Sequence, residues 1–301
     1  MEKKTAGIII GPCCSLACVF CGGHNKSSEQ ETKKQEIDVY KNIQEFKQKG
    51  FERIAISGSD PIEYEEIIEL IKYIKTQGFK WVQLSTHGNR MSNPVFLKKL
   101  INSGVDRLRI PIYGSNAKVH DSATRTKGSF NKVMFGIRKI LKDAPQINIQ
   151  ISCLVLKQNK NDLLNVVDFI TNLGIENFYF SIPCLEEEAS SFYIPIKDLP
   201  PILNKLYKHV LKVNDNIRFL EIPFCVFGEF NLKNISNMCY PPDLGKYNQP
   251  PERLKTSIPD LPSYRVKKKV EICKGCKAFN NCDGFFVNDI DKFGIGKLKK
   301  I

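Results

Sequence analysis

The sequence contains no apolar run long enough to cross a bilayer, which takes about 20 consecutive apolar residues. Its first residues, Met1–Lys4, lead into a short apolar run and do not resemble a secretory signal peptide. Solenoid-type repeats and low-complexity tracts are also absent. These absences argue against a membrane-spanning protein, an exported protein and a repeat array, and we predict a cytoplasmic location.

Acidic residues are fewer than basic ones. The chain has 32 Asp and Glu against 45 Lys and Arg, which gives a net charge of +13 at pH 7. Such an excess can attract polyanions over a long range. The lysines are scattered along the outer faces of predicted helices, however, and only residues 267–269 and 297–300 form short basic runs. We therefore expect a basic surface without a nucleic acid partner.

Cysteine, by contrast, is plentiful: there are eleven, and their clustered spacing favours metal binding over disulfides. Cys14, Cys18 and Cys21 have the spacing C-x3-C-x2-C, while Cys13 fits no register of this pattern. Cysteine thiolates are the usual ligands of iron–sulfur clusters, and a four-iron cluster held by three of them keeps one iron open to another ligand. A zinc knuckle or a redox pair is the alternative.

Strand-like and helix-like segments alternate over the first two thirds of the chain. Six segments are predicted as strands: residues 7–10, 53–57, 81–85, 107–112, 147–155 and 177–182. Helices are expected between them, the first of them capped by Asp38. This alternation predicts an α/β protein with a parallel sheet and right-handed crossovers. Six units are too few for a complete eight-stranded barrel, so the sheet is open or partly closed.

At Cys14, Cys18 and Cys21 the sequence resembles the radical S-adenosylmethionine (SAM) enzymes, which have this spacing on the loop after the first barrel strand. The resemblance implies a partial (β/α)6 barrel over residues 1–190, a [4Fe–4S] cluster on these three cysteines, and SAM on the open iron. Phe20 matches the aromatic residue common in the family. Reductive cleavage of SAM would give methionine and a 5′-deoxyadenosyl radical that abstracts a hydrogen atom from the substrate. An oxidoreductase or isomerase reaction is implied, with a reductant such as flavodoxin or ferredoxin as partner.

The same resemblance implies SAM-binding loops at the ends of the following strands. Gly58, Ser59 and Asp60 stand where the family often has Gly-Gly-Glu-Pro, although an ordinary helix-capping turn is the alternative. The other cofactor-binding residues implied are Ser85, Thr86, His87, Arg109 and Ser152. We do not expect His87 or His120 to act as an acid or base, because no specific carboxylate is paired with either.

A second cysteine group lies near the C-terminus. Cys273, Cys276 and Cys282 have the pattern C-x2-C-x5-C-x-G, which resembles the auxiliary-cluster extensions of radical SAM enzymes of the SPASM or twitch type. The resemblance implies such a cysteine-rich domain over residues 191–301. No cysteine follows Cys282, so one auxiliary iron–sulfur cluster, a [4Fe–4S], is expected rather than two. A zinc ribbon is the alternative.

The fourth ligand of this auxiliary cluster should lie upstream of the C-terminal group. Cys225 is the first candidate and Cys239 the rival. Radical epimerases of the resembled family quench the substrate radical with a hydrogen atom from a cysteine thiol. If Cys225 is a ligand, Cys239 is therefore a candidate catalytic residue.

The resemblance to the auxiliary-cluster subgroup favours a ribosomally made peptide or a protein as substrate, to be epimerised, crosslinked or oxidised. A carbohydrate or another small metabolite comes second, and RNA third. An iron–sulfur electron carrier or redox sensor is the alternative from another class.

Overall fold

The computed structural model describes residues 5–10, 14–21, 29–185, 191–213, 216–228 and 266–301, with residues 29–38 by their backbone alone. These residues form two compact units. The first comprises the described residues up to Pro111 together with Thr124–Ile151. The second comprises Ile112–Ala123 and the described residues from Ser152 onward. Each unit has its own set of buried aliphatic and aromatic side chains.

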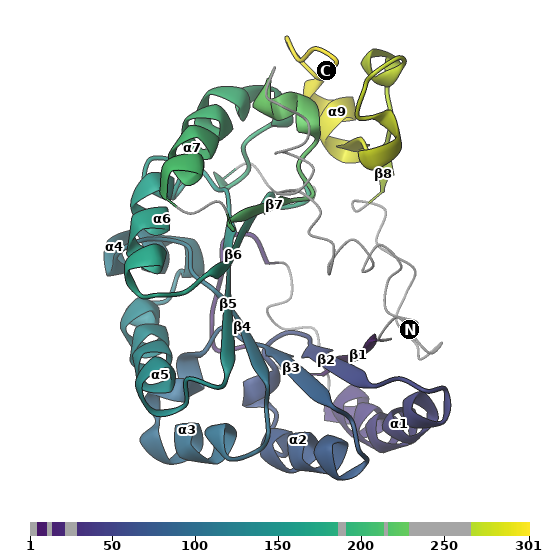
Figure 1. Cartoon of the computed structure of the whole chain (residues 1–301), viewed down its shortest axis with the longest axis vertical. Coiled ribbons are helices and arrows are strands. Elements are labelled where there is room, and N and C mark those ends of the chain that lie inside the picture. The colour runs from purple at the N-terminus through teal and green to yellow at the C-terminus, as the bar shows by residue number, and fades with distance from the viewer. Residues whose placement is uncertain (1–4, 11–13, 22–28, 186–190, 214–215, 229–265) are drawn as a thin grey trace. The chain divides into compact units, whose positions relative to one another are not determined.

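Seven strands follow one another in sequence order in a single sheet (Figure 1). The pairing is parallel between β1 and β2, β2 and β3, β3 and β4, and β6 and β7. The predicted α/β class and all six predicted strands are confirmed. The strands are β1 (Thr5–Ile9), β2 (Arg53–Ser57), β3 (Trp81–Ser85), β4 (Arg107–Pro111), β5 (Asn148–Leu154), β6 (Asn177–Ser181) and β7 (Arg218–Leu220).

The seventh strand was not among the predicted ones. β7 pairs with β6 and lies beyond residue 190, where we expected the barrel to end. It has three residues, which is too short for the alternation that reveals a strand in a sequence. The boundary between the two expected domains stays a prediction.

Helices connect the strands. They are α1 (Glu29–Gln48), α2 (Ile67–Thr76), α3 (Pro94–Ile101), α4 (Ala117–Thr124), α5 (Ser129–Asp143), α6 (Leu163–Asn172) and α7 (Pro200–Val213). As predicted, α3 begins at Asn93 and Pro94, where the Asn93 Oδ1 accepts the amides of Val95 and Phe96. The prediction for Asp38 was wrong: α1 begins at Glu29, so Asp38 lies inside the helix.

The two faces of the strands in the first unit differ in polarity. Ile54 and Ile56 on β2 are fully buried, as are Leu108 and Ile110 on β4. Their neighbours along the strands point to the opposite face, because successive side chains of a strand alternate. That opposite face includes polar residues such as Arg109, which is half-buried. Ligands can therefore meet polar groups on this face, while α2 and α3 pack along the other (Figure 1).

The last part of the second unit is built from short elements. β8 (Lys267–Lys268) pairs antiparallel with β9 (Phe285–Phe286), and α9 (Val287–Phe293) follows. Buried Asp289 on α9 accepts the Ile196 amide at 3.0 Å, which fixes α9 against the segment before α7. Within the described residues, no helix combines the length and the apolar character needed to cross a membrane.

At Gly58, the backbone of the loop after β2 lies very close to the backbone of Ile10. The φ of Gly58 is +148°, and a Cβ built there would lie 1.6 Å from the carbonyl oxygen of Ile10. The Ile10 amide also donates to the carbonyl of Ser57 at 2.8 Å. Only glycine therefore permits the loop after β2 to pass directly beside the end of β1.

We predict that Gly58→Ala lowers the free energy of unfolding by more than about 3 kcal/mol, because backbone strain and a backbone clash add. Gly174→Ala is the matched control: Gly174 has φ +74° but no atom within 4 Å of its Cβ position. We expect it to cost roughly 1 to 2 kcal/mol. Anaerobic chemical denaturation of both variants measures the difference. Equal losses would contradict the close approach.

Candidate functional site

The loop after β1 brings three cysteines together in the first unit. Cys18 is buried, Cys14 is half-buried and Cys21 is exposed. The amide of Cys21 donates to the carbonyl of Cys18 at 3.2 Å, which closes a tight turn. Burial, together with a smaller effect of the neighbouring thiols, raises the pKa of Cys14 to about 11 and that of Cys18 to about 12. Such thiols ionise readily only beside a cation, so this donor set fits a metal cluster.

Two contacts fix this cysteine loop in place. Buried Asn89, on the 3-10 turn Asn89–Ser92, donates through Nδ2 to the Ser15 Oγ at 3.1 Å. On the other side, the Ala17 amide lies 3.1 Å from the Thr124 carbonyl and 3.3 Å from the Thr126 Oγ1. Neither anchor is predicted by the sequence.

Asp60, in the loop after β2, is completely buried. Its Oδ1 accepts the Thr86 hydroxyl at 2.6 Å, whereas its Oδ2 has no hydrogen-bond partner among the described residues. Burial raises the pKa of Asp60 to about 7, although the Thr86 hydroxyl and the amides of Ile62 and His87 favour the charged form. The buried Oδ2 can accept a hydrogen bond from a ligand, and an ammonium group is the best donor because it also balances the charge.

Asp60 stands at the N-cap position of the 3-10 turn Pro61–Glu63 and is followed by a proline, as the helix-capping alternative requires. The Ile62 amide of that turn favours the charged form of its carboxyl, although no full capping hydrogen bond is formed. Gly58 and Ser59, just before Asp60, are exposed and lie on the same loop. The loop therefore combines an exposed backbone at Gly58 and Ser59 with one buried carboxyl group at Asp60.

The other predicted cofactor-binding residues do not all belong to the same unit. Thr86 and Arg109 are brought together, because the Thr86 amide donates to the Arg109 carbonyl at 3.0 Å. The Arg109 Nε donates in turn to the Gln150 Oε1 at 3.0 Å. Ser85 is half-buried at the end of β3, and Ser152 belongs to the second unit. The aromatic residue of the cysteine loop, Phe20, is half-buried.

The two histidines lie in different surroundings. His120 is buried, and its Nδ1 accepts the amide of Tyr113 at 3.2 Å. It is therefore a satisfied core residue. His87 contributes its backbone amide to the surroundings of Asp60.

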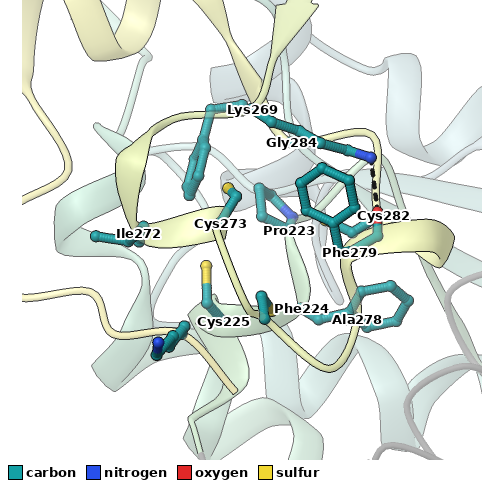
Figure 2. A pocket seen from close by; sticks show the side chains of 13 residues that line it. Pro223, Phe224, Cys225, Lys269, Ile272, Cys273, Ala278, Phe279, Cys282 and Gly284 are labelled. Carbon is teal, nitrogen blue, oxygen red and sulfur yellow. Dashed lines mark hydrogen bonds between the residues drawn. The ribbon is translucent and has the colours of Figure 1, made fainter.

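Four cysteines line one cavity in the second unit (Figure 2). Cys225 lies on the 3-10 turn Phe224–Phe227, and the others are Cys273, Cys276 and Cys282. Burial raises the pKa of Cys225 to about 12, and the other three thiols add to the effect because all are close to it. The cavity has about 350 Å³ of empty space, part of it open to solvent.

Within the described ranges, no three His, Cys, Asp or Glu side chains are packed tightly enough to hold a single metal ion. The four cysteines of the second unit therefore surround a cavity and are not close enough together to bind one metal ion. Cys13 and Cys239 lie outside the described residues.

Comparison with known proteins identifies the class. The family model described as the radical SAM superfamily matches residues 8–170, which is more than half of the chain. The chain belongs to this superfamily, and membership implies a [4Fe–4S] cluster and SAM.

Two curated relatives illustrate the sequence likeness. A protein named probable GTP 3′,8-cyclase, from Methanocaldococcus jannaschii, is 26% identical over 215 residues, which cover 70% of this chain and 69% of that protein. The AdoMet-dependent heme synthase of Methanosarcina barkeri is 28% identical over 198 residues, covering 65% of this chain and 55% of that protein.

Two solved structures share the fold. Streptococcus suis SuiB bound to S-adenosylmethionine matches with a TM-score of 0.64 and 15% identity, over 98% of this chain and 76% of SuiB. The enzyme anSMEcpe with bound AdoMet and the Kp18Cys peptide gives a TM-score of 0.62 and 15% identity, over 98% of this chain and 93% of that one. At such identities the likeness concerns the fold alone, which is the partial (β/α) barrel class.

We predict that Asp60→Asn weakens SAM binding by roughly 10- to 100-fold, the value of a charge-assisted hydrogen bond. Iron content should not change, because Asp60 is not one of the three thiols. Anaerobic equilibrium dialysis with labelled SAM measures the affinity. Glu63→Gln is the control, since it removes a nearby charge without touching the buried carboxyl. Equal affinities for wild type and Asp60→Asn would refute the role of Asp60.

Proposed function

We propose that Cys14, Cys18 and Cys21 hold the [4Fe–4S] cluster and that SAM binds beside it, against Asp60. The observation that carries the proposal is that three cysteines with mutually interacting thiols share one loop, in which Cys14 and Cys18 are removed from water. When bound, the cluster and SAM supply a 5′-deoxyadenosyl radical that abstracts a hydrogen atom from the substrate.

The residues of the chain would bind and orient SAM. Asp60 would accept the SAM ammonium group through its unpartnered Oδ2, while Thr86 fixes the carboxyl from the other side. Asn89 would keep the cysteine loop in position through Ser15. Because Asp60 and Asn89 are buried, they would also keep water away from the side of SAM that they contact.

The test is anaerobic reconstitution with iron and sulfide, followed by SAM and dithionite and an assay for 5′-deoxyadenosine. We expect about eight irons per chain for two clusters, and 5′-deoxyadenosine from the wild type. The triple variant Cys14→Ala, Cys18→Ala, Cys21→Ala should retain about four irons and form none. Eight irons without SAM cleavage would favour the iron–sulfur electron carrier or redox sensor instead.

We further propose a twitch-like auxiliary domain within residues 191–301, with Cys225, Cys273, Cys276 and Cys282 as the four ligands of a second [4Fe–4S] cluster. The close approach of Cys225 to the other three thiols supports this set, and a cavity between sulfur atoms suits a cluster larger than a single ion. Cys239 would then be free to act as a hydrogen-atom donor.

We predict that Cys225→Ala reduces the iron content from about eight to about four per chain and removes one of the two cluster signals in electron paramagnetic resonance. Cys239→Ala should keep both clusters. Cys184→Ala is the control, because Cys184 is a half-buried cysteine of the same unit. Loss of iron in Cys239→Ala but not in Cys225→Ala would reverse the assignment. About four irons plus bound zinc in the wild type would make this domain a zinc site.

For the substrate, we propose a ribosomally made peptide or a protein as the first candidate. Fold relatives include SuiB bound to precursor peptide SuiA and anSMEcpe bound to a peptide. A small metabolite is the second candidate, because the curated relatives are named for GTP cyclisation and heme synthesis. Transfer of deuterium from a labelled candidate into 5′-deoxyadenosine distinguishes the two classes directly.

A further inference from the structure

The four-cysteine cavity reaches the surface of the second unit beside lysines and an exposed ring. Lys269, Phe279 and Lys300 line it together with the cysteines. Both lysines are exposed, and the Phe279 side chain is 41% exposed. The Lys269 Nζ lies 3.8 Å from the centroid of the Phe279 ring and donates to the Phe279 carbonyl at 2.6 Å (Figure 2). An aromatic surface therefore sits directly next to the cavity, with ammonium groups beside it.

The surroundings of this ring are strongly basic. Residues 266–301 contain nine lysines against four acidic residues. One of those acids, Asp289, is buried and accepts an amide, so it does not offset the surface charge. The other three acids each form an ion pair with a lysine: Lys267 with Asp283, Lys268 with Asp291, and Lys274 with Glu271.

Lys277, which lies between the cavity-lining residues Cys276 and Ala278, and the cavity-lining Lys300 add positive charge that no ion pair within the described part of the chain offsets. Lys277 and Lys300 are exposed, and neither forms an ion pair with a described residue. The Lys277 amide donates to the Ile301 carbonyl at 2.9 Å, so the two segments that contain these lysines lie side by side. Lys269, Lys277 and Lys300 are called the lysine rim below.

We propose that the lysine rim and Phe279 form the docking surface for an acidic protein that donates single electrons. The inference rests on the proposed auxiliary cluster, because only a redox group in the cavity makes this surface useful to such a donor. In the transfer, the donor's reduced flavin or iron–sulfur group loses one electron and the cluster gains it. No bond is formed or broken, and no atom changes partner.

The chemistry of the surface favours this partner. Electron transfer becomes steeply slower with distance, so a donor must approach the surface nearest to the cluster. Transient electron-transfer contacts are small, and opposite charges around them speed association without requiring high affinity. The lysine rim supplies the charges, and the exposed ring of Phe279 supplies the apolar centre that protein interfaces commonly have.

A single-stranded nucleic acid is another polyanion that a basic surface with an exposed ring could bind. Its binding surfaces use a basic groove with several aromatic side chains on which successive bases stack. Besides Phe279, the large apolar side chains exposed among the described residues of 266–301 include Val266 but no second aromatic ring. The surface is therefore better suited to a compact acidic protein.

The test uses the reconstituted protein and the double variant Lys277→Glu, Lys300→Glu. Lys269 is left unchanged because its ammonium group supports the Phe279 carbonyl. Each protein is mixed in a stopped-flow instrument with reduced flavodoxin, an acidic flavoprotein, and the flavin absorbance is followed. We expect the second-order rate at low salt to fall at least about tenfold in the variant, and the difference to vanish near 1 M salt. Affinity for flavodoxin, measured by biolayer interferometry, should weaken in parallel.

Two controls separate docking from other effects. Lys98→Glu, Lys99→Glu changes the net charge equally, at exposed positions on α3 in the first unit, and should react like the wild type. Photoexcited 5-deazariboflavin, a small neutral reductant, should reduce both double variants as fast as the wild type, because it needs no docking surface.

The outcomes are distinguishable. Unchanged flavodoxin kinetics in the rim variant, with about eight irons still present, would overturn the docking proposal and leave the auxiliary cluster intact. An equal loss in the α3 control would overturn it as well, since the effect would then be one of net charge. Preferential, rim-dependent binding of an RNA oligonucleotide would replace the donor by a nucleic acid. About four irons in the wild type would instead refute the auxiliary cluster itself.

Discussion

The desolvation of cysteine thiols governs both candidate sites. Removing a thiolate from water is costly, and burial raises the pKa of Cys14, Cys18 and Cys225 to about 11 or 12. Without a cation these side chains are protonated at neutral pH even more completely than exposed thiols are. Binding of iron reverses that preference, because the metal stabilises the thiolate, and each ligand releases a proton as the cluster enters. Cluster assembly and local folding are coupled through this exchange.

The first site adds a second constraint, which is the close approach of backbone segments. Gly58 touches the end of β1, and the loop that follows turns Asp60 inward. An acid buried with one unpartnered oxygen is unfavourable in an isolated protein. A cationic ligand would remove the penalty, so the feature that costs stability in the absence of the ligand would increase the binding energy. SAM, which membership of the radical SAM superfamily implies, carries an ammonium group of the required charge.

Much of the fold could be predicted because it depends on local patterns. The apolar spacing of α2 and the Asn93-Pro94 start of α3 are visible in a short window of sequence. The start of α1 could not be predicted in this way, because residues 29–37 include only one large apolar side chain and show no helical periodicity. β7 was missed because three residues cannot display a period.

The candidate site, like the fold, could be predicted only where it depends on residues close together in the sequence. The cysteine spacing and the position of Asp60 are local, and both could be read directly. The anchor between Asn89 and Ser15 joins residues 74 positions apart, and the contact of Ala17 with Thr126 spans 109 positions. Such pairs depend on tertiary packing, so no window of sequence reveals them.

The separation of Cys225 from Cys273 has a consequence for the chain between them. With both as ligands of one cluster, the metal centre would act as a cross-link that closes a loop of roughly 50 residues. Such a closure removes conformational freedom from the unfolded chain, in the manner of a disulfide. Its entropic cost grows only with the logarithm of loop length. The segment between the two cysteines could therefore gain or lose residues at little cost in stability.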